Sequence, residues 1–173
     1  MTSSAALVRA ESLIRSIPDY PQPGVLFRDI TPLLADREAL HATTAALVEP
    51  FLGSFDVVAG IEARGFILAG AAAIAANTGF VPIRKAGKLP VPAAAVEYTL
   101  EYGTATIEMH EDLPAGARVL LIDDVLATGG TLAAGRTIVE RLGYSVAGIS
   151  VLFEIEALHG RARTGDVHTV FRS

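Results

Sequence analysis

The chain has 173 residues, no cysteine and a formal net charge of −5. This length suits one domain of about 100–200 residues, large enough to bury a core without a disulfide or a structural metal. The lack of cysteine excludes thiol catalysis and Cys-ligated metal centres. The acidic balance argues against a general binder of nucleic acid, because no excess of Lys or Arg supplies a broad positive field.

The N-terminal segment does not have the composition of a secretory signal. Arg9, Glu11 and Arg15 interrupt its apolar residues. The longest apolar run, residues 65–76, is too short to span a bilayer. We therefore expect a cytoplasmic protein that does not associate with membranes.

Helical patterns dominate the first third of the chain. Apolar residues recur at helical spacing between residues 7 and 17, which predicts a helix ended by Pro18. A turn-rich segment follows at residues 21–32. Asp36 is then placed to cap a second helix. The apolar face of that helix would include Leu40, Leu47, Val48 and Phe51.

Short apolar runs then alternate with helical segments. Strands are expected at residues 57–61, 80–83, 119–122, 146–153 and 167–171, with helices at residues 65–76 and 131–142. Pro82 would confine its strand to a sheet edge or a strand end. Residues 98–109 predict a hairpin or mobile flap around Gly103. This order predicts an α/β fold with a mostly parallel central sheet flanked by helices.

The segment VLLIDDVLATGGT, residues 119–131, carries the strongest functional signal. Ligands of parallel sheets bind beyond the carboxyl ends of the strands, where Asp123 and Asp124 would lie. The small residues that follow let successive backbone N–H groups point at one anion, close to a helix N-terminus. This loop consists of Ala127, Thr128, Gly129, Gly130 and Thr131. A ribose phosphate fits both parts, with its phosphate in the loop and its hydroxyls on the carboxylates. The alternative is a strand-to-helix turn in which these side chains only cap the helix.

This string resembles the signature of the type I phosphoribosyltransferases, where it binds the ribose 5-phosphate part of phosphoribosyl pyrophosphate (PRPP). The resemblance implies a single domain over residues 1–173. Residues 1–34 would form an N-terminal helix and base-binding hood, and residues 84–109 a flexible flap. It also implies Mg2+, bound mainly through PRPP oxygens and water, since the sequence offers no clean set of protein ligands.

The segment PQPGVLFRDITPLL, residues 21–34, presents an aromatic ring on a proline-stiffened loop. Such a ring can stack on a flat base; alternatively, the loop is only pinned to the core. The segment resembles the base-binding loop of adenine phosphoribosyltransferases. The resemblance implies that Phe27 stacks on adenine and that backbone groups around Leu26 and Arg28 read its amino edge. Leu126 would cover the other face.

Basic residues gather in IRKAGKLP, which contains Arg84, Lys85 and Lys88, and Arg64 follows a buried strand in IEARGF. By themselves they could form a solvated surface patch or hold a phosphorylated ligand. Both strings resemble their counterparts in adenine phosphoribosyltransferases, where such residues grip pyrophosphate, some of them across a dimer interface. A homodimer is therefore implied.

The segment YTLEYG, residues 98–103, places a carboxylate and a tyrosine on a glycine-terminated flap. The flap could close over a site and exclude water, or it could be an exposed hairpin. In the resembling family the glutamate of this motif, Glu101 here, is the proposed proton-handling group, with Tyr102 on the same flap. The expected catalytic residues are thus Glu101, Tyr102 and Arg64. The four histidines follow no metal-ligand spacing.

The resemblance implies an enzyme of purine salvage that transfers ribose 5-phosphate from PRPP to adenine through an oxocarbenium-like transition state, yielding AMP and pyrophosphate. Three alternatives remain open at this point. The chain could act on another base, it could be a PRPP-sensing regulator that binds nucleic acid, or it could be a purely structural α/β protein. The acidic balance and the absence of an added basic arm weigh against the regulator.

Overall fold

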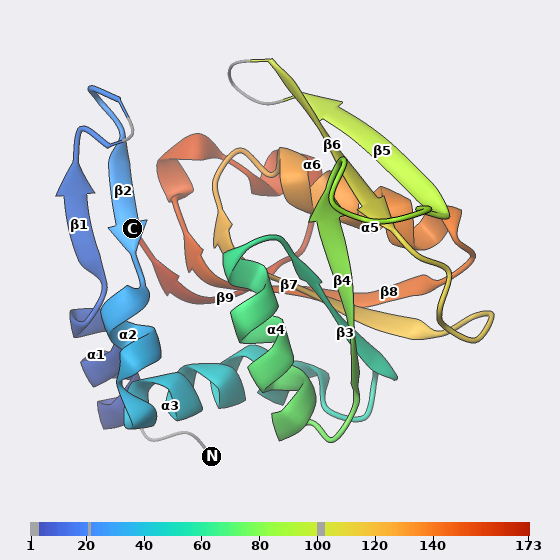
Figure 1. Cartoon of the computed structure of the whole chain (residues 1–173). Coiled ribbons are helices and arrows are strands. Elements are labelled where there is room, and N and C mark those ends of the chain that lie inside the picture. The colour runs from blue at the N-terminus through green and yellow to red at the C-terminus, as the bar shows by residue number, and fades with distance from the viewer. Residues whose placement is uncertain (1–3, 21, 100–102) are drawn as a thin grey trace. The chain divides into compact units, whose positions relative to one another are not determined.

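Figure 1 shows a computed structural model of the chain, which describes residues 4–20, 22–99 and 103–173. The chain forms two units, Met1–Ala46 and Leu47–Ser173. The residues expected to form the base-binding hood belong to the first unit. The expected phosphate loop and basic cluster belong to the second.

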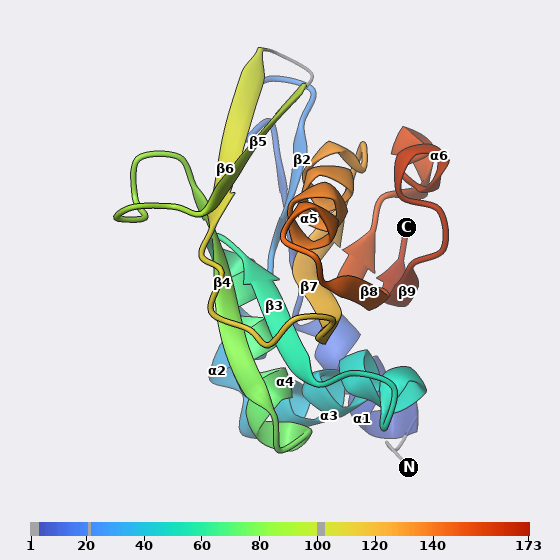
Figure 2. The same ribbon diagram turned by 90° about the vertical axis from the view of Figure 1, so that its right-hand side faces the viewer.

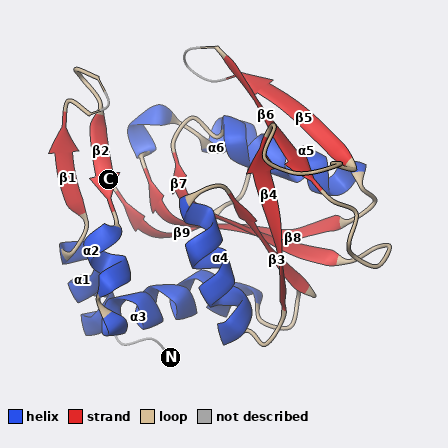
Figure 3. Cartoon of the chain, viewed as in Figure 1, coloured by secondary structure: helices blue, strands red, loops and turns tan. Residues whose placement is uncertain are grey.

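The first unit contains a two-stranded antiparallel ribbon, visible in Figure 3. Its strands are β1 (Arg15–Pro18) and β2 (Leu26–Asp29). The expected helix through residue 17 is therefore wrong beyond Ser12, and the expected turn segment contains β2. The β-branched Ile17 lies opposite Phe27 in the ladder. Strand pairing satisfies the backbone groups of this segment and suits a β-branched residue, and so overrides the helical spacing of its apolar side chains.

The helices that begin in this unit are α1 (Ser4–Ser12), α2 (Thr31–Ala35) and α3 (Arg37–Val48), the last of which runs into the second unit. The expected cap of α3 is confirmed. The Asp36 carboxylate accepts hydrogen bonds from the backbone N–H groups of Glu38 at 3.1 Å and Ala39 at 2.9 Å. These bonds satisfy donors that a helix start otherwise leaves unpaired.

The second unit is built on a seven-stranded sheet of order β5-β6-β4-β3-β7-β8-β9. In chain order the strands are β3 (Val57–Ile61), β4 (Gly79–Lys85), β5 (Ala94–Thr99), β6 (Thr104–Met109), β7 (Arg118–Leu126), β8 (Ser145–Glu154) and β9 (His168–Arg172). Neighbours from β4 to β9 pair in parallel, whereas β5 and β6 form an antiparallel hairpin joined to β4. The α/β class, the mostly parallel sheet, the expected strands and the hairpin are therefore confirmed. The placement expected from Pro82 is wrong, because β4 is an interior strand and Pro82 lies within it; the β4–β6 pairing involves only Arg84 and Lys85 of β4.

Helices α4 (Arg64–Ala75) and α5 (Gly130–Arg141) cover opposite faces of this sheet (Figure 2). The chain crosses from β3 to β4 in one direction and from β7 to β8 in the other, so right-handed connections place the two helices on opposite sides. The remaining helical segments are η1 (Glu49–Phe51), η2 (Glu156–Leu158) and α6 (Arg161–Thr164). No helix in the described part of the chain is long and apolar enough to cross a membrane.

Glycines let both helices approach the sheet closely. A Cβ added to Gly60 of β3 would lie 2.7 Å from the Cβ of Ala69 in α4. On the other face, a Cβ on Gly135 of α5 would lie 3.0 Å from the Leu121 side chain. The buried cluster on the α5 face includes Leu121, and its apolar burial holds α5 on the strands that lead into the site.

The strand directions bring separate loops to one edge of the sheet. Strands β3, β4 and β7 are parallel neighbours, so their carboxyl ends open on the same side. Glu62 follows β3, Lys85 ends β4, and residues 127–129 connect β7 to α5. The candidate functional residues of the second unit therefore lie at this edge of the sheet.

Candidate functional site

A cavity of about 290 Å³ lies at this carboxyl edge. It is lined by Glu62, Lys85, Tyr98, Ala105, Asp123, Asp124, Val125, Ala127, Thr128, Gly129, Gly130, Thr131 and Leu132. These residues come from the segment after β3, the ends of β4 and β7, the loop before α5, the first turn of α5, and the β5–β6 hairpin. All the residues expected to hold a ribose phosphate therefore line one cavity.

The small-residue loop makes a tight turn into α5. Gly129 has φ of 80° and caps the helix in the left-handed region, which favours glycine. A Cβ at this position would lie less than 3.0 Å from the Gly160 carbonyl oxygen, so the loop also depends on the missing side chain. The N–H groups of the first turn of α5 carry about half a positive charge and have no partner within the helix. An anion of phosphate size suits this end of the cavity.

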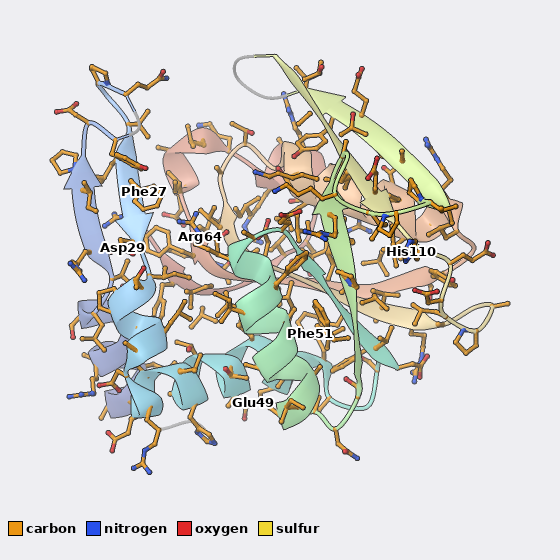
Figure 4. The ribbon with its side chains drawn as sticks, in the orientation of Figure 1. Phe27, Asp29, Glu49, Phe51, Arg64 and His110 are labelled. Carbon is orange, nitrogen blue, oxygen red and sulfur yellow. The ribbon has the colours of Figure 1, made fainter. Side chains whose placement is uncertain are left out.

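The two aspartates are buried next to the loop, with only 7% of Asp123 and 8% of Asp124 exposed. The backbone N–H of Asp124 donates to the Asp123 carboxylate at 2.8 Å. Arg64, labelled in Figure 4 at the start of α4, pairs with Asp124 over 2.6 Å between Nε and Oδ2. Burial raises the pKa of Asp123 well above its ordinary value, and the neighbouring Asp124 carboxylate raises it further.

The basic cluster is organised by Glu62, a residue that the sequence reading did not single out. Its carboxylate accepts hydrogen bonds from Lys88 Nζ at 2.7 Å and from the backbone N–H of Lys85 at 3.0 Å. The guanidinium of Arg84 lies 3.5 Å from the same carboxylate. The hydrogen bond from Lys88, followed by the other donors, lowers the pKa of Glu62 to about 2. The peptide bond from Glu62 to Ala63 is cis.

The residues of the expected base loop lie on β2 in the first unit. Phe27 is half-buried, and its ring packs edge-on against Tyr20 with centroids 5.1 Å apart. Leu26 is 47% exposed, and the Arg28 side chain donates to the Ser16 hydroxyl. Figure 4 shows the Phe27 side chain on this ribbon.

Leu126 does not have the position expected for a residue that covers a base. It is fully buried, belongs to the apolar core and does not line the cavity. Val125, one residue earlier, lines the cavity. The consecutive residues Asp123, Asp124 and Val125 line the cavity, whereas Leu126 packs in the core. The residue that β7 offers there is Val125.

Glu101 and Tyr102, expected as catalytic residues of the flap, lie outside the described residues. The strands on either side, β5 and β6, are described, and each contributes one residue to the cavity lining, Tyr98 and Ala105. The hairpin that carries the expected flap therefore borders the candidate site.

Comparison with known proteins matches the phosphoribosyl transferase domain family over residues 34–171. The chain belongs to the phosphoribosyltransferase family. It is 58% identical to the adenine phosphoribosyltransferase of Arthrobacter sp. (strain FB24) over 152 residues, which cover 87% of this chain and 82% of the relative. The adenine phosphoribosyltransferase of Thermobifida fusca is also 58% identical, over 89% of each chain.

Solved structures give the same result for this phosphoribosyltransferase. The crystal structure of adenine phosphoribosyltransferase from Rhodothermus marinus aligns with a TM-score of 0.92 at 48% identity, covering 99% of this chain and 100% of that one. The Saccharomyces cerevisiae enzyme, solved with adenine and an imino-altritol bisphosphate, has a TM-score of 0.91 at 32% identity, over 97% and 99% of the two chains.

Of the two cavity residues of this phosphoribosyltransferase that were missed, Glu62 and Val125, the first could have been found from the sequence. Glu62 directly follows a buried strand, and the basic cluster ends the next strand along the chain. Parallel neighbours end at the same edge, so a carboxylate and cations in these positions are expected to meet. Alternation along the strand would not have found Val125, because the consecutive residues Asp123, Asp124 and Val125 all line the cavity.

The oxygen donors of the cavity do not form a ready metal site. Among the described residues, no group of three or more His, Asp or Glu side chains could hold a metal ion. Glu62 is bonded to the basic cluster and Asp124 to Arg64, while burial disfavours the charged form of Asp123. An ion in this cavity would therefore need oxygen ligands from a substrate and water, which suits Mg2+.

Proposed function

We propose that this chain is an adenine phosphoribosyltransferase of purine salvage, which converts adenine and PRPP to AMP and pyrophosphate. One observation carries the proposal: the aspartate pair and the small-residue loop line a single cavity at the carboxyl edge of the sheet. Membership of the phosphoribosyltransferase family supports the reaction class, and relatives with 58% identity that act on adenine support the base.

The 5-phosphate of PRPP would bind the loop that begins α5. Its negative charge matches the unpaired N–H groups of the helix start, and Thr128 and Thr131 add hydroxyl donors to the cavity wall. Asp123 and Asp124 would accept hydrogen bonds from the ribose hydroxyls. Their burial beside the loop fixes the distance between the phosphate and hydroxyl contacts, so the sugar is held at both ends.

Pyrophosphate would meet the cations Arg64, Arg84, Lys85 and Lys88. Arg64 would then exchange its ion pair with Asp124 for contacts with substrate, which frees the Asp124 carboxylate for ribose. Magnesium carried on PRPP oxygens would supply further positive charge for the leaving group. Lys85 and Lys88 are exposed and therefore accessible to a charged ligand.

Adenine would stack on Phe27, with backbone groups around Leu26 and Arg28 reading its amino edge. Val125, rather than Leu126, would cover the other face of the base, because Val125 lines the cavity. Glu101 would take the proton that the attacking ring nitrogen loses, and Tyr102 would lie on the same flap. The support for this base-binding arrangement is the sequence resemblance and the identity to adenine-specific relatives.

The reaction breaks the bond between the anomeric carbon and pyrophosphate and forms one to a ring nitrogen of adenine. The sugar passes through an oxocarbenium-like state, as in glycoside hydrolysis. Positioning the reactants contributes about 7–11 kcal/mol, whereas one proton acceptor contributes about 3–5 kcal/mol. The phosphate loop and the cations should therefore affect the rate more than Glu101 does.

We further propose that the enzyme acts in the cytoplasm as a homodimer. The described part of α4 exposes Ile67 and Ile74, of which 50% and 83% are accessible, on a helix whose other face packs on the sheet. Apolar side chains exposed on one helix are compatible with a subunit contact. Sedimentation equilibrium tests this: a Glu substitution at Ile74 should shift the mass from two chains toward one.

The decisive experiment mixes the purified chain with PRPP, Mg2+ and one base at a time, and measures nucleotide and pyrophosphate. AMP from adenine, with little product from hypoxanthine, guanine, xanthine or orotate, is the expected result. Product from another base would refute the adenine assignment but keep the reaction class. PRPP binding without turnover on any base would favour the sensor alternative.

A further inference from the structure

Glu62 is the carboxylate on which the basic cluster of this chain converges. It lies at the end of β3, and its side chain is only 9% exposed. Its partners come from the segment that starts at the end of β4: the Lys88 ammonium, the Lys85 backbone N–H and the Arg84 guanidinium. Because the carboxylate is largely shielded from water, these contacts are stronger than those of an exposed ion pair.

A second contact ties Arg84 directly to Lys88. The Arg84 guanidinium donates to the Lys88 carbonyl oxygen at 2.9 Å, which closes the turn between them. Without a counter-ion, Arg84, Lys85 and Lys88 would repel one another and favour an open segment. With Glu62 ionised, the three cations keep a formal charge of +2, so the cluster is ordered and still attracts anions.

We propose that Glu62 is a positioning residue of the pyrophosphate site: it holds Arg84 and Lys88 beside the part of the cavity that Glu62 and Lys85 line. The inference rests on the proposed function, which supplies pyrophosphate as the ligand of the cluster. Glu62 itself lines the cavity beside Lys85, but it bonds no substrate oxygen, because both are anionic. It therefore acts through Lys88 and Arg84.

The opposite role, in which Glu62 competes with pyrophosphate for Lys88, makes a contrary prediction. If Glu62 blocked the site, the uncharged Glu62→Gln variant would bind pyrophosphate more tightly than the wild type. If Glu62 orders the site, the same variant binds pyrophosphate more weakly, although one negative charge has been removed. Glu62→Gln preserves the shape of the side chain, so its fold is expected to survive.

The test uses the full chain with inorganic pyrophosphate and Mg2+ in calorimetry, together with steady-state rates of AMP formation. Glu62→Ala should raise the dissociation constant of pyrophosphate and the KM for PRPP by about tenfold, the worth of a strong charge-assisted hydrogen bond. The KM for adenine should change by less than about twofold, because Glu62 acts on the pyrophosphate end of the site. Partial unfolding would instead lower the rate and leave both KM values unchanged.

A double-mutant cycle shows whether Glu62 acts through Lys88. Lys88→Ala should also weaken pyrophosphate by about tenfold, and the double variant should be little weaker than either single variant. Additive losses, about a hundredfold in the double variant, would overturn the proposal. Equal or tighter binding by Glu62→Gln would overturn it as well.

Glu108 provides the matched control. Its carboxylate accepts a hydrogen bond from the Gly87 backbone N–H of the same segment at 3.2 Å, but among the described residues it forms no ion pair with the cations of the cluster, although it lies opposite Arg84 in the β4–β6 ladder. Glu108→Ala should leave pyrophosphate affinity within about twofold of the wild type. A tenfold loss there would mean that any loosening of the segment suffices, which contradicts a specific role of Glu62. Wild-type AMP formation, measured in the same series, tests the proposed function independently.

Discussion

Gly129→Ala tests whether the turn before α5 depends on a missing side chain. Gly129 has φ of 80°, and its Cα faces the carbonyl oxygen of Gly160 across the base of the loop. An alanine there would meet two separate costs. The left-handed backbone disfavours any L residue, and the new Cβ would lie less than 3.0 Å from that oxygen, closer than real Cβ atoms come.

The two costs have different sizes and different consequences. The left-handed conformation costs about 1–2 kcal/mol for alanine. Relieving the overlap requires the loop or the Gly160 segment to move, which adds about 1–3 kcal/mol as in an overpacked core. A displacement of about 1 Å at a reacting centre can cost a hundredfold in rate. We therefore expect a loss of about 2–5 kcal/mol in unfolding free energy and about a hundredfold loss in kcat/KM.

Gly143→Ala separates these effects, because Gly143 also has φ of 80° but an added Cβ would meet nothing within 4 Å. It should lose only the backbone cost, about 1–2 kcal/mol, and keep its activity. Chemical denaturation and initial rates on both variants make the comparison. Equal losses of stability and activity in the two variants would refute the argument that close approach to Gly160 shapes the phosphate loop.

The remaining predictions concern buried carboxylates. Asp123→Asn should raise the melting temperature at pH 7 by a few degrees, about 1 kcal/mol, while abolishing most activity. The folded-state pKa of Asp123 lies above 3.8, so its carboxyl destabilises the folded state only above that pH. The stability gain of Asp123→Asn should therefore vanish near pH 3.5. A gain that persists at that pH would contradict the raised pKa of Asp123. Arg161→Ala should lower the free energy of unfolding by about 2 kcal/mol in urea denaturation, because it leaves Glu154, which is 4% exposed, without its two 2.7 Å hydrogen bonds. A change below about 0.5 kcal/mol would show that the ion pair with Arg172 is enough to compensate the Glu154 charge.

The parts of the fold that follow from burial were predictable. Short runs as apolar as those of β3 and β7 are typical of strands buried on both faces, and both strands lie where they were expected. Asp36 was predictable as a helix cap because its side chain bonds backbone N–H groups two and three residues further along the same segment. Local chemistry decided these elements.

The first strand was not predictable from its own residues. Arg15–Pro18 pairs with β2, which follows after a turn, and the residues of Arg15–Pro18 alone do not indicate that pairing. The apolar spacing that continues from α1 is compatible with a helix, so the choice depends on a contact made elsewhere in the chain. The same applies to Glu62, whose partners lie on the next strand.

The C-terminal segment from Gly160 onward supports the site by packing against the phosphate loop. Gly160 touches that loop at Gly129, and α6 then begins with Arg161, which bonds the buried Glu154 at the end of β8. Strand β9 pairs with the same part of β8, so the segment after Gly160 is fixed at both its ends. The cavity wall contains buried aspartates whose charges oppose folding, and such a site needs stability from neighbouring structure. The Glu154–Arg161 pair and β9 supply it next to the loop, without contributing a residue to the cavity lining.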